Sequence, residues 1–135
     1  MTYLLDTNVC IKHLNGQSES IRQHLVAAQP QDIVLCSVVR AELFYGALKS
    51  RQSIQNITRI REFIDRFVSL AFDDRAAEYY GQIRVQVEQQ GTPIGPNDMM
   101  IAAIAVAYQV TLITHNTREF DRVPGLRWED WEASP

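Results

Sequence analysis

Short apolar runs alternate with longer amphipathic segments along this chain. The apolar runs, rich in β-branched residues, predict strands at 3–5, 33–36, 69–72, 110–114 and 126–129. Apolar residues at helical spacing predict helices at 8–14, 20–28, 54–68, 73–90 and 98–108, and a further helix that Ser37 caps and that runs through Leu48. The helices that end at 48 and 68 are expected to form a helical hairpin. This alternation predicts a three-layer α/β/α fold with a mainly parallel central sheet.

Two of these strands end abruptly in polar residues. The first runs directly into Asp6, and the strand at 110–114 runs into His115 and Asn116, with Glu119 following shortly after. Ligands of open α/β sheets bind beyond the carboxyl ends of the strands, so these side chains are candidates for a site. Each also has an ordinary interpretation: Asn116 could cap a helical turn and Glu119 could be solvated. His115 is expected to be a substrate contact or a bystander rather than a ligand.

Two further acids lie in predicted helices that are otherwise largely apolar. Asp98 begins the segment DMMIAAIAVAY, and Glu42 lies within SVVRAELFYGAL. Burial of a carboxylate is unfavourable unless its charge is compensated, and a helix dipole contributes at most about 1–2 kcal/mol. If these acids met Asp6 in one cleft, each pair about 4 Å apart would repel by roughly 4 kcal/mol at an effective dielectric constant of 20. Such a cluster would require a bound cation.

Taken singly, none of these acids is specific for a metal site. Asp6 could be a helix N-cap after a strand, and Asp98 could be a first-turn acid that favours the helix dipole. Glu42 could leave the apolar face of its helix and pair with Arg40 or Lys49. The order in which the acids occur is therefore more informative than any one of them.

Length and composition limit the range of functions. The chain has 135 residues, 46% of them hydrophobic, which suffices for one domain with a substantial core. Cys10 and Cys36 lie in apolar segments without metal-binding spacing, so both are expected to be buried, with neither a disulfide nor a zinc site. The first residues do not resemble a signal peptide, and no apolar run is long enough to cross a bilayer. A cytoplasmic protein is expected.

Several short motifs occur in a characteristic order. They are DTN at 6–8, an acid at 42, ND at 97–98 followed by IAA at 101–103, and TxNxxEF at 114–120. In this order the chain resembles the PIN domain, and more narrowly the VapC-type ribonuclease toxins of type II toxin-antitoxin systems. The segments GTPIGPND at 91–98 and RVPGLRWEDW at 122–131 extend the resemblance over essentially the whole chain. It implies a single PIN domain over residues 1–135.

The resemblance also implies a catalytic metal site. Asp6, Glu42 and Asp98 match the three acidic catalytic positions of the family, so they are expected to hold Mg²⁺, with Mn²⁺ as an alternative. Oxygen-only ligands suit such hard cations better than they suit zinc. The hydroxyl groups of Thr7 and Thr114 are expected to support the site by orienting the carboxylates.

The last motif departs from the commoner family pattern. In that pattern an aspartate follows Thr-x, whereas this chain has Asn116 there and an acid at Glu119. Glu119 is expected to act as the fourth catalytic acid and Asn116 as a supporting residue. Because Asn116 adds no charge, the number of metal ions, one or two, stays open.

The activity implied by the resemblance is endonucleolytic hydrolysis of RNA. Metal-activated water would attack the phosphodiester in line and leave a 5′-phosphate and a 3′-hydroxyl. The resemblance implies transfer RNA as the substrate, because family members often cleave it at the anticodon arm and relatives with a similar NTREF ending include ones that act on initiator transfer RNA. The alternative is a catalytically inactive PIN-like module that binds RNA or protein, because Asn116 replaces an acid. Dehalogenase-type phosphotransferases and receiver domains are disfavoured, since the first strand lacks a second acid and no lysine follows a later strand.

The charge balance affects how RNA could bind. The net charge of −3 comes from 13 basic and 16 acidic residues, and without the four site acids the balance is 13 against 12. RNA binding must therefore rely on local patches rather than on a global field, although a solvated surface is the alternative for each patch. Candidates beside the site are Arg40, Arg118 and Arg122, and others in the hairpin are Lys49, Arg51, Arg59 and Arg61.

The resemblance implies two kinds of protein partner. VapC-type toxins are typically homodimers that a VapB-type antitoxin neutralises by packing along apolar helices and obstructing the acidic cleft. The helix with Leu43, Phe44, Tyr45 and Leu48 has more apolar surface than one core-facing stripe requires. It could serve as an antitoxin groove or as a dimer contact, and burial within the monomer is the alternative.

Overall fold

A computed structural model describes residues 1–91 and 93–132. Thr92 of the GTPIGPND segment and residues 133–135 of the expected domain lie outside the described residues. The strands are β1 (Tyr3–Leu5), β2 (Ile33–Cys36), β3 (Val68–Leu70), β4 (Thr111–Ile113) and β5 (Trp128–Glu129). The α-helices are α1 (Thr7–Leu14), α2 (Glu19–Ala27), α3 (Ser37–Lys49), α4 (Ser53–Ile64), α5 (Asp74–Gln89), α6 (Pro96–Tyr108) and α7 (Thr117–Phe120), with a 3-10 turn at Pro30–Asp32.

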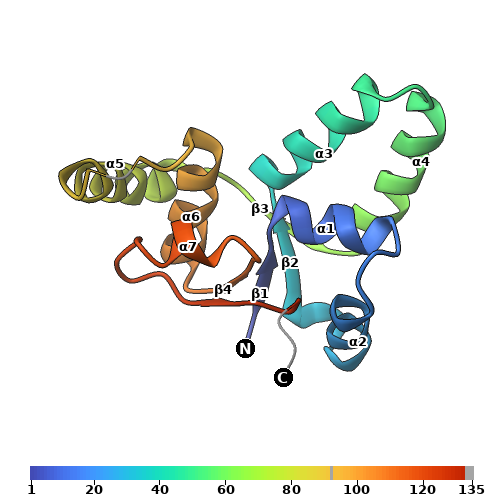
Figure 1. The fold of residues 1–135 in the computed structure, drawn as a ribbon, viewed down its shortest axis with the longest axis horizontal. Coiled ribbons are helices and arrows are strands. Elements are labelled where there is room, and N and C mark those ends of the chain that lie inside the picture. Colours follow the sequence, from blue (N-terminus) through green and yellow to red (C-terminus); the bar gives the residue numbers. More distant parts are fainter. Residues whose placement is uncertain (92, 133–135) are drawn as a thin grey trace.

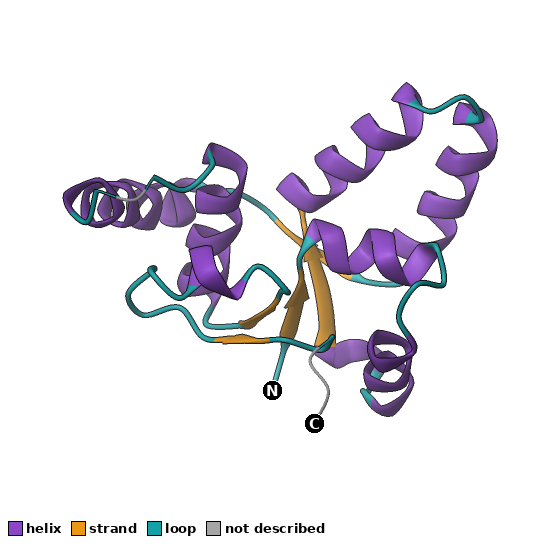
Figure 2. Cartoon of the chain, in the orientation of Figure 1, coloured by secondary structure: helices purple, strands orange, loops and turns teal. Residues whose placement is uncertain are grey.

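The five strands form one sheet in the order β3-β2-β1-β4-β5, and every neighbouring pair is parallel. Helices α5, α6 and α7 lie on one side of the sheet, whereas α1 and α2 lie on the other (Figure 1). Helices α3 and α4 pack against each other as an arm that extends beyond the strands (Figure 2). The predicted α/β fold, the parallel sheet and the helical hairpin are thus confirmed.

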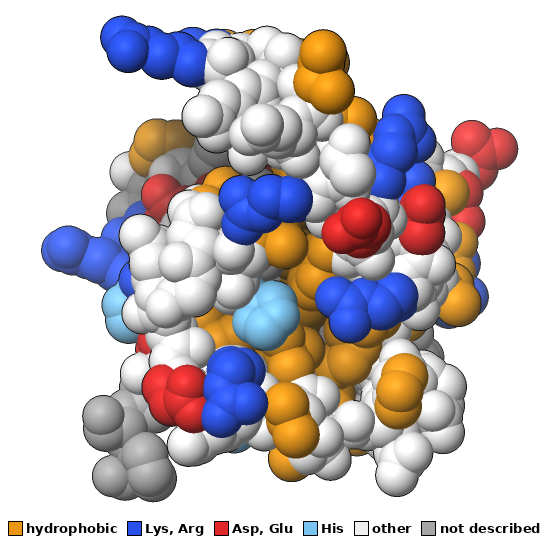
Figure 3. Space-filling view, turned by 90° about the vertical axis from the view of Figure 1, so that its right-hand side faces the viewer, with side chains coloured by type: hydrophobic (Ala, Val, Ile, Leu, Met, Phe, Trp, Pro, Cys, Tyr) orange, Lys and Arg blue, Asp and Glu red, His pale blue; other side chains and the backbone are white. Residues whose placement is uncertain are grey.

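The central strands and α6 supply the core. All four residues of β2 are buried, as are seven residues of α6, in keeping with the apolar runs from which these elements were predicted. Cys10 and Cys36 are buried free thiols, as expected, and burial raises the pKa of the Cys36 thiol to about 11. Apolar side chains also gather in a hollow on the face turned toward the viewer in Figure 3. Within the described residues, no helix has the length and apolarity needed to span a bilayer.

Three predicted boundaries were wrong in informative ways. The fourth helix ends at Ile64 rather than at 68, because the chain turns there and Val68 pairs with Val34 as the first residue of β3. Ser37 is not an N-cap but the first residue of α3, and its Oγ accepts a hydrogen bond from the Phe72 N–H at 3.2 Å. Helix α6 begins at Pro96, two residues before the predicted start.

Candidate metal centre at the carboxyl edge of the sheet

The sheet order brings the ends of β2, β1 and β4 together at one edge. Asp6 follows β1 directly, helix α3 follows β2 and carries Glu42, and Thr114 follows β4. The first turn of α6 brings Asp98 to the same place, since the negative charges of Asp6 and Glu42 both contribute to the raised pKa of Asp98. Glu119 on α7 is the fourth acid, and its charge also contributes to the raised pKa of Asp98. The chain therefore assembles four acids from four separate segments.

Asp6 is held by hydrogen bonds on both carboxylate oxygens. Its Oδ1 accepts a hydrogen bond from the Thr7 N–H at 2.8 Å, and its Oδ2 accepts one from the Thr114 Oγ at 2.8 Å. Asp6 is also the N-cap of α1. The same residue therefore caps a helix and contributes a carboxylate to the cleft. It is only 5% exposed. Burial raises the pKa of Asp6 above its ordinary value, although these two hydrogen bonds act in the opposite direction.

Glu42 faces the same cleft from α3. Its Oε1 accepts a hydrogen bond from the Thr7 Oγ at 2.5 Å, and its Oε2 accepts one from the Asn97 Nδ2 at 3.3 Å. The alternative pairing of Glu42 with Arg40 or Lys49 does not occur among the described residues. Thr7 therefore contacts both acids, one through its backbone and one through its hydroxyl group.

Asn97 is a site residue that the sequence analysis noted only as part of a motif. Its amide contacts Glu42 because Pro96 starts α6 and places Asn97 and Asp98 in the first turn. The signal that could have identified it is the polar Asn-Asp pair before an otherwise apolar helix. An unpaired carboxylate on α3 would then have been an obvious acceptor for the amide.

Asp98 is the most perturbed acid of the cleft. Its pKa is raised from 3.8 to about 7, chiefly by burial and then by the charge of Asp6. A hydrogen bond with Glu119 and the charges of Glu119 and Glu42 raise it further. Burial and the neighbouring charges thus favour the protonated form of Asp98, and the contact with Asp98 places Glu119 at the cleft rather than in solvent alone.

Asn116 links β4 to Glu119. Its Nδ2 donates a hydrogen bond to Glu119 Oε2 at 2.9 Å, and its backbone N–H donates one to the Thr114 Oγ at 3.0 Å. Asn116 occupies the N-cap position of α7 but makes no side-chain cap, because its amide is engaged with Glu119 instead. The Thr114 hydroxyl therefore connects Asp6 to the segment that carries Glu119.

The four acids share one electrostatic feature. Among the described residues, none of them has a Lys, Arg or His nitrogen within 4.0 Å. All the ligand atoms they offer are carboxylate oxygens, which suit a divalent hard cation. A cavity of about 410 Å³ opens beside Asp6, and its polar lining consists of Asn8, Lys12, Gln17, His115, Asn116 and Glu132. This arrangement can bind a cation next to a space for substrate.

Comparison with known proteins identifies the family. The family model described as PIN domain matches residues 3–126. The chain belongs to the PIN domain family. It is 41% identical to the tRNA(fMet)-specific endonuclease VapC of Shigella flexneri, over 97% of this chain and 98% of that protein. It is 39% identical to Ribonuclease VapC2 of Rickettsia felis, over 98% of this chain and 99% of that protein.

A solved structure resembles this PIN domain closely. DNA-bound VapBC from Salmonella typhimurium matches with a TM-score of 0.91 and 39% identity, covering 97% of this chain and 98% of that one. The resemblance to VapC-type proteins, drawn from motifs alone, is thereby confirmed. The parallel sheet and the helices on both of its faces are the shared architecture.

Proposed function

We propose that this PIN domain is a metal-dependent endoribonuclease and the toxin component of a type II toxin-antitoxin system. The observation that carries the proposal is the group of four acids at the carboxyl edge of the sheet, none of which has a basic nitrogen within 4.0 Å in the described part of the chain. The names of the relatives, an endonuclease and a ribonuclease at about two-fifths identity, support the same activity. We also infer that residues 1–135 form one domain.

We assign the catalytic roles as follows. Asp6, Glu42 and Asp98 would hold Mg²⁺, with Mn²⁺ as a substitute, and Glu119 would be the fourth acid. A cation held there would supply Lewis-acid chemistry, by lowering the pKa of water and stabilising negative charge on the scissile phosphate. Asp6 is positioned for its role by two hydrogen bonds, so its carboxylate needs little reorganisation.

The supporting residues keep the acids in place. Thr7 bridges Asp6 and Glu42, and Thr114 joins Asp6 to the backbone of Asn116.

Hydrolysis by activated water produces a 5′-phosphate and a 3′-hydroxyl, and it does not require the neighbouring 2′-hydroxyl. Fragment ends therefore distinguish this chemistry from that of ribonucleases that use a pair of histidines.

We propose transfer RNA as the substrate, and the anticodon arm of initiator transfer RNA in particular. The support is the name of the Shigella relative, a tRNA(fMet)-specific endonuclease. Arg40 lies two residues before Glu42 on α3, Arg118 lies on α7 and Arg122 follows α7. Each of the three is therefore close in sequence to an acid of the cleft. We assign these arginines to phosphate contacts.

Three basic residues of the hairpin make contacts within the fold. Arg61 lies over the Phe44 ring at 5.1 Å, and Lys49 lies over the Tyr45 ring at 5.6 Å. Arg59 contacts the Leu14 carbonyl group. These interactions give Lys49, Arg59 and Arg61 a role within the fold, which makes them weaker candidates for RNA binding than Arg40, Arg118 and Arg122.

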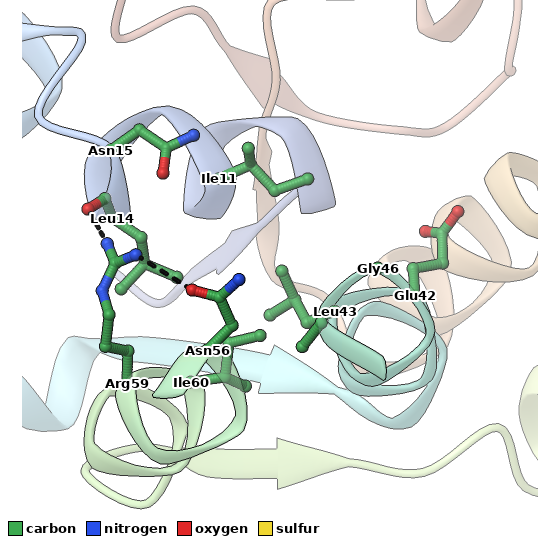
Figure 4. Close-up of a pocket in the computed structure, with 10 residues that line it drawn as sticks. Ile11, Leu14, Asn15, Glu42, Leu43, Gly46, Asn56, Arg59 and Ile60 are labelled. Atoms are coloured by element: carbon green, nitrogen blue, oxygen red, sulfur yellow. Dashed lines mark hydrogen bonds between the residues drawn. The ribbon is translucent and has the colours of Figure 1, made fainter. Parts of the chain in front are cut away.

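We propose a VapB-type antitoxin as the protein partner, with an apolar groove as its docking surface. The groove has a volume of about 240 Å³ and lies between α1, α3 and α4 (Figure 4). Ile11, Leu14, Leu43 and Ile60 line its apolar part, and Glu42 of the acid cluster lies at its border. A bound segment can therefore reach the cleft, and the Salmonella structure is itself a VapBC complex.

The groove can be tested at Gly46. Gly46 lines the groove and a Cβ there would meet no atom within 4 Å, so the first carbon of a new side chain has room, and Gly46→Phe is expected to narrow the groove. We expect this variant to bind its antitoxin less tightly while it still cleaves RNA. Gly81→Phe on α5, whose Cβ is equally unobstructed, is the matched control and should bind normally.

We also propose that the protein is a homodimer. Tyr45 and Leu48 on α3 are 65% and 67% exposed, and Ile54 on α4 is 83% exposed, which leaves an apolar surface at the end of the hairpin. Analytical ultracentrifugation of the free protein tests the assembly. A monomer at micromolar concentration would contradict it.

The activity is tested with antitoxin-free protein and purified initiator and elongator transfer RNAs. The reactions contain Mg²⁺, Mn²⁺ or EDTA, and the fragment ends are mapped. We expect discrete fragments with 5′-phosphates, formed only with a divalent cation. Asp98→Asn should be inactive, whereas Asp74→Asn, which replaces an exposed first-turn acid of α5, should cleave normally. Intact RNA under all conditions would favour the inactive binding module instead.

A further inference from the structure

A second group of metal-ligating side chains lies beyond the ends of β4 and β5. It consists of His115, which follows β4, and of Asp130 and Glu132, which follow β5. One ligand atom from each residue lies within 4.8 Å of the others. Among the described residues this is the one trio that meets that distance criterion, and none of its members belongs to the group of four acids. His115 and Glu132 also line the cavity beside Asp6, so the trio borders the space proposed for the substrate but shares no ligand with the acid cleft.

The hydrogen bonds of the trio leave one oxygen of each carboxylate directed at the same nitrogen. Asp130 Oδ1 accepts a hydrogen bond from the Glu132 N–H at 2.9 Å, while Oδ2 is hydrogen-bonded to His115 Nδ1 at 3.0 Å. Glu132 Oε1 contacts the Lys12 ammonium group, while Oε2 lies 3.8 Å from the same His115 Nδ1. The imidazole nitrogen and the two oxygens therefore converge.

Glu132 Oε2 is an orphaned acceptor. It is buried and has no hydrogen-bond partner within the described part of the chain, and the Glu132 side chain as a whole is 11% exposed. A buried carboxylate oxygen without a donor or a cation is unfavourable, and such groups in native proteins usually have a partner. The position of Oε2, beside a histidine nitrogen and a second carboxylate, indicates a cation as the missing partner.

The segment that carries the two acids is firmly anchored. Trp131 lies between them and is buried, with the Tyr3 ring at 5.1 Å and the His24 ring stacked at 4.8 Å. Its indole N–H donates a hydrogen bond to Glu129 Oε1 at 3.1 Å, and its carbonyl group accepts one from the Ser20 Oγ at 2.5 Å. The carboxylates are therefore preorganised by packing, as ligands of a structural ion need to be.

We propose that His115, Asp130 and Glu132 form a binding site for a divalent transition-metal cation of the Zn²⁺ type. Bonds of about 2.0–2.2 Å from a tetrahedral ion to its ligands place those ligands about 3.3–3.6 Å apart, and the observed separations of 3.0 and 3.8 Å lie on either side of this range. The imidazole ligand favours Zn²⁺ over Mg²⁺, in contrast to the oxygen-only cleft. His115, which the sequence marked as a bystander or substrate contact, becomes a ligand.

Charge and protonation are consistent with one bound dication. The carboxylates of Asp130 and Glu132 contribute two negative charges, and Lys12 offsets one of them. Ligation through Nδ1 requires the neutral imidazole tautomer with its proton on Nε2, so a proton leaves Nδ1 when the cation enters. His115 is 59% exposed at its side chain, which leaves an entry path for the ion and a position for water as a fourth ligand.

The test is a Zn²⁺ titration of the full chain carrying Asp98→Asn, which weakens competition from the acid cleft. Imidazole ¹⁵N resonances are recorded throughout, with His13 and His24 as internal controls. We expect one equivalent of Zn²⁺ to shift the Nδ1 resonance of His115 and to leave the other two histidines unchanged. A His115 spectrum that does not change at saturating Zn²⁺, or equal shifts of all three histidines, would overturn the proposal.

Two variants give opposite expected effects on Zn²⁺ affinity. His115→Gln removes the nitrogen ligand and should weaken binding by more than about tenfold, as measured by calorimetry. Lys12→Met keeps the aliphatic stem but removes the ammonium group that competes for Glu132, so it should strengthen binding. Unchanged affinity in His115→Gln would show that Zn²⁺ binds elsewhere.

Discussion

The two sides of the acid cleft differ in how their carboxylates are stabilised. Asp6, at the end of β1, has a hydrogen-bond donor on each oxygen, and these donors lower its pKa against the effect of burial. Asp98, on the first turn of α6, has a pKa of about 7, and every cause that acts on it raises the pKa. The first side is organised by the protein itself, whereas the second depends on a cation for stable ionisation.

This difference indicates a division of labour in the proposed site. In the proposed site the Asp6 side would fix the position of the ion, because its carboxylate is already oriented by Thr7 and Thr114. The Asp98 side would favour ion binding, because a cation would relieve its repulsion with Asp6, Glu119 and Glu42. Substitutions on the two sides should therefore have different effects on stability even where they have the same effect on activity.

The largest expected effect is the loss of cleavage in Asp6→Asn and Asp98→Asn. Each removes a charged ligand of the proposed cation, so cleavage should fall by a factor on the order of 10³. Single-turnover kinetics on transfer RNA at saturating Mg²⁺ measures the effect. If either variant kept more than about a tenth of the parent rate, that acid would not be a required ligand.

Thr114→Val breaks the organised side of the cleft while keeping its shape. The variant loses the hydrogen bond to Asp6 Oδ2 and the acceptor for the Asn116 N–H. We expect Mg²⁺ affinity to fall by about 10–100-fold and the free energy of unfolding to fall by about 1–3 kcal/mol. Metal titrations of activity and urea unfolding in EDTA give the two values. Thr114→Ser retains the hydroxyl group and should preserve most of the affinity.

The other side of the cleft predicts a pH-dependent gain of stability in Asp98→Asn. The pKa of Asp98 is higher in the folded protein, at about 7, than its ordinary value of 3.8. Folding is therefore favoured by protonation of Asp98, and in the absence of metal this contribution is lost as the pH rises from about 4 to about 7. Asp98→Asn should be more stable than the parent at pH 8 by about 1–2 kcal/mol, a value reduced for partial exposure.

Urea unfolding in EDTA at several pH values between 4 and 8 measures this difference. The advantage of Asp98→Asn should be small at pH 4, grow up to about pH 7 and then level off. Saturating Mg²⁺ at pH 8 should reduce or reverse it, because only the parent gains the full binding energy of the ion. A stability advantage that does not vary with pH would contradict the raised pKa of Asp98 in the folded protein.

The strand residues show why the fold was predictable from sequence. The run IVLC at β2 is buried at every position, and TYLL and VTLI are apolar up to the residue where the polar cluster begins. A strand of a parallel sheet that is covered on both faces consists mostly of apolar residues, so its sequence is a nearly continuous apolar run. The boundary between α4 and β3 was missed because Phe67 and Val68 continue the apolar spacing of the helix. Local periodicity cannot show that Val68 pairs with Val34.

Strand ends and the order of the motifs predicted the acids of the site but not the contacts between distant residues. Asp6 and Asn116 were indicated by the polar residues after β1 and β4, and Glu42 and Asp98 by their places in otherwise apolar helices. The resemblance to PIN domains then predicted that the acids belong to one site. The contact between Asn97 and Glu42 joins residues 55 positions apart, and no local pattern encodes it. The same holds for Glu132, whose approach to His115 depends on the pairing of β4 with β5.

The smallest expected effect comes from Asn116→Asp, which tests the departure from the common family pattern. The variant replaces a donor to Glu119 Oε2 with a fifth carboxylate, so in EDTA it should lose about 0.5–1 kcal/mol of stability through repulsion. With Mg²⁺ the added charge should raise ion affinity a few-fold, and activity at limiting Mg²⁺ should rise in step. Asn116→Ala removes the donor without adding charge, so it should lose stability but gain no affinity. Equal Mg²⁺ affinity in both variants would show that residue 116 lies outside the reach of the ion, and that Glu119 alone completes the acid cluster.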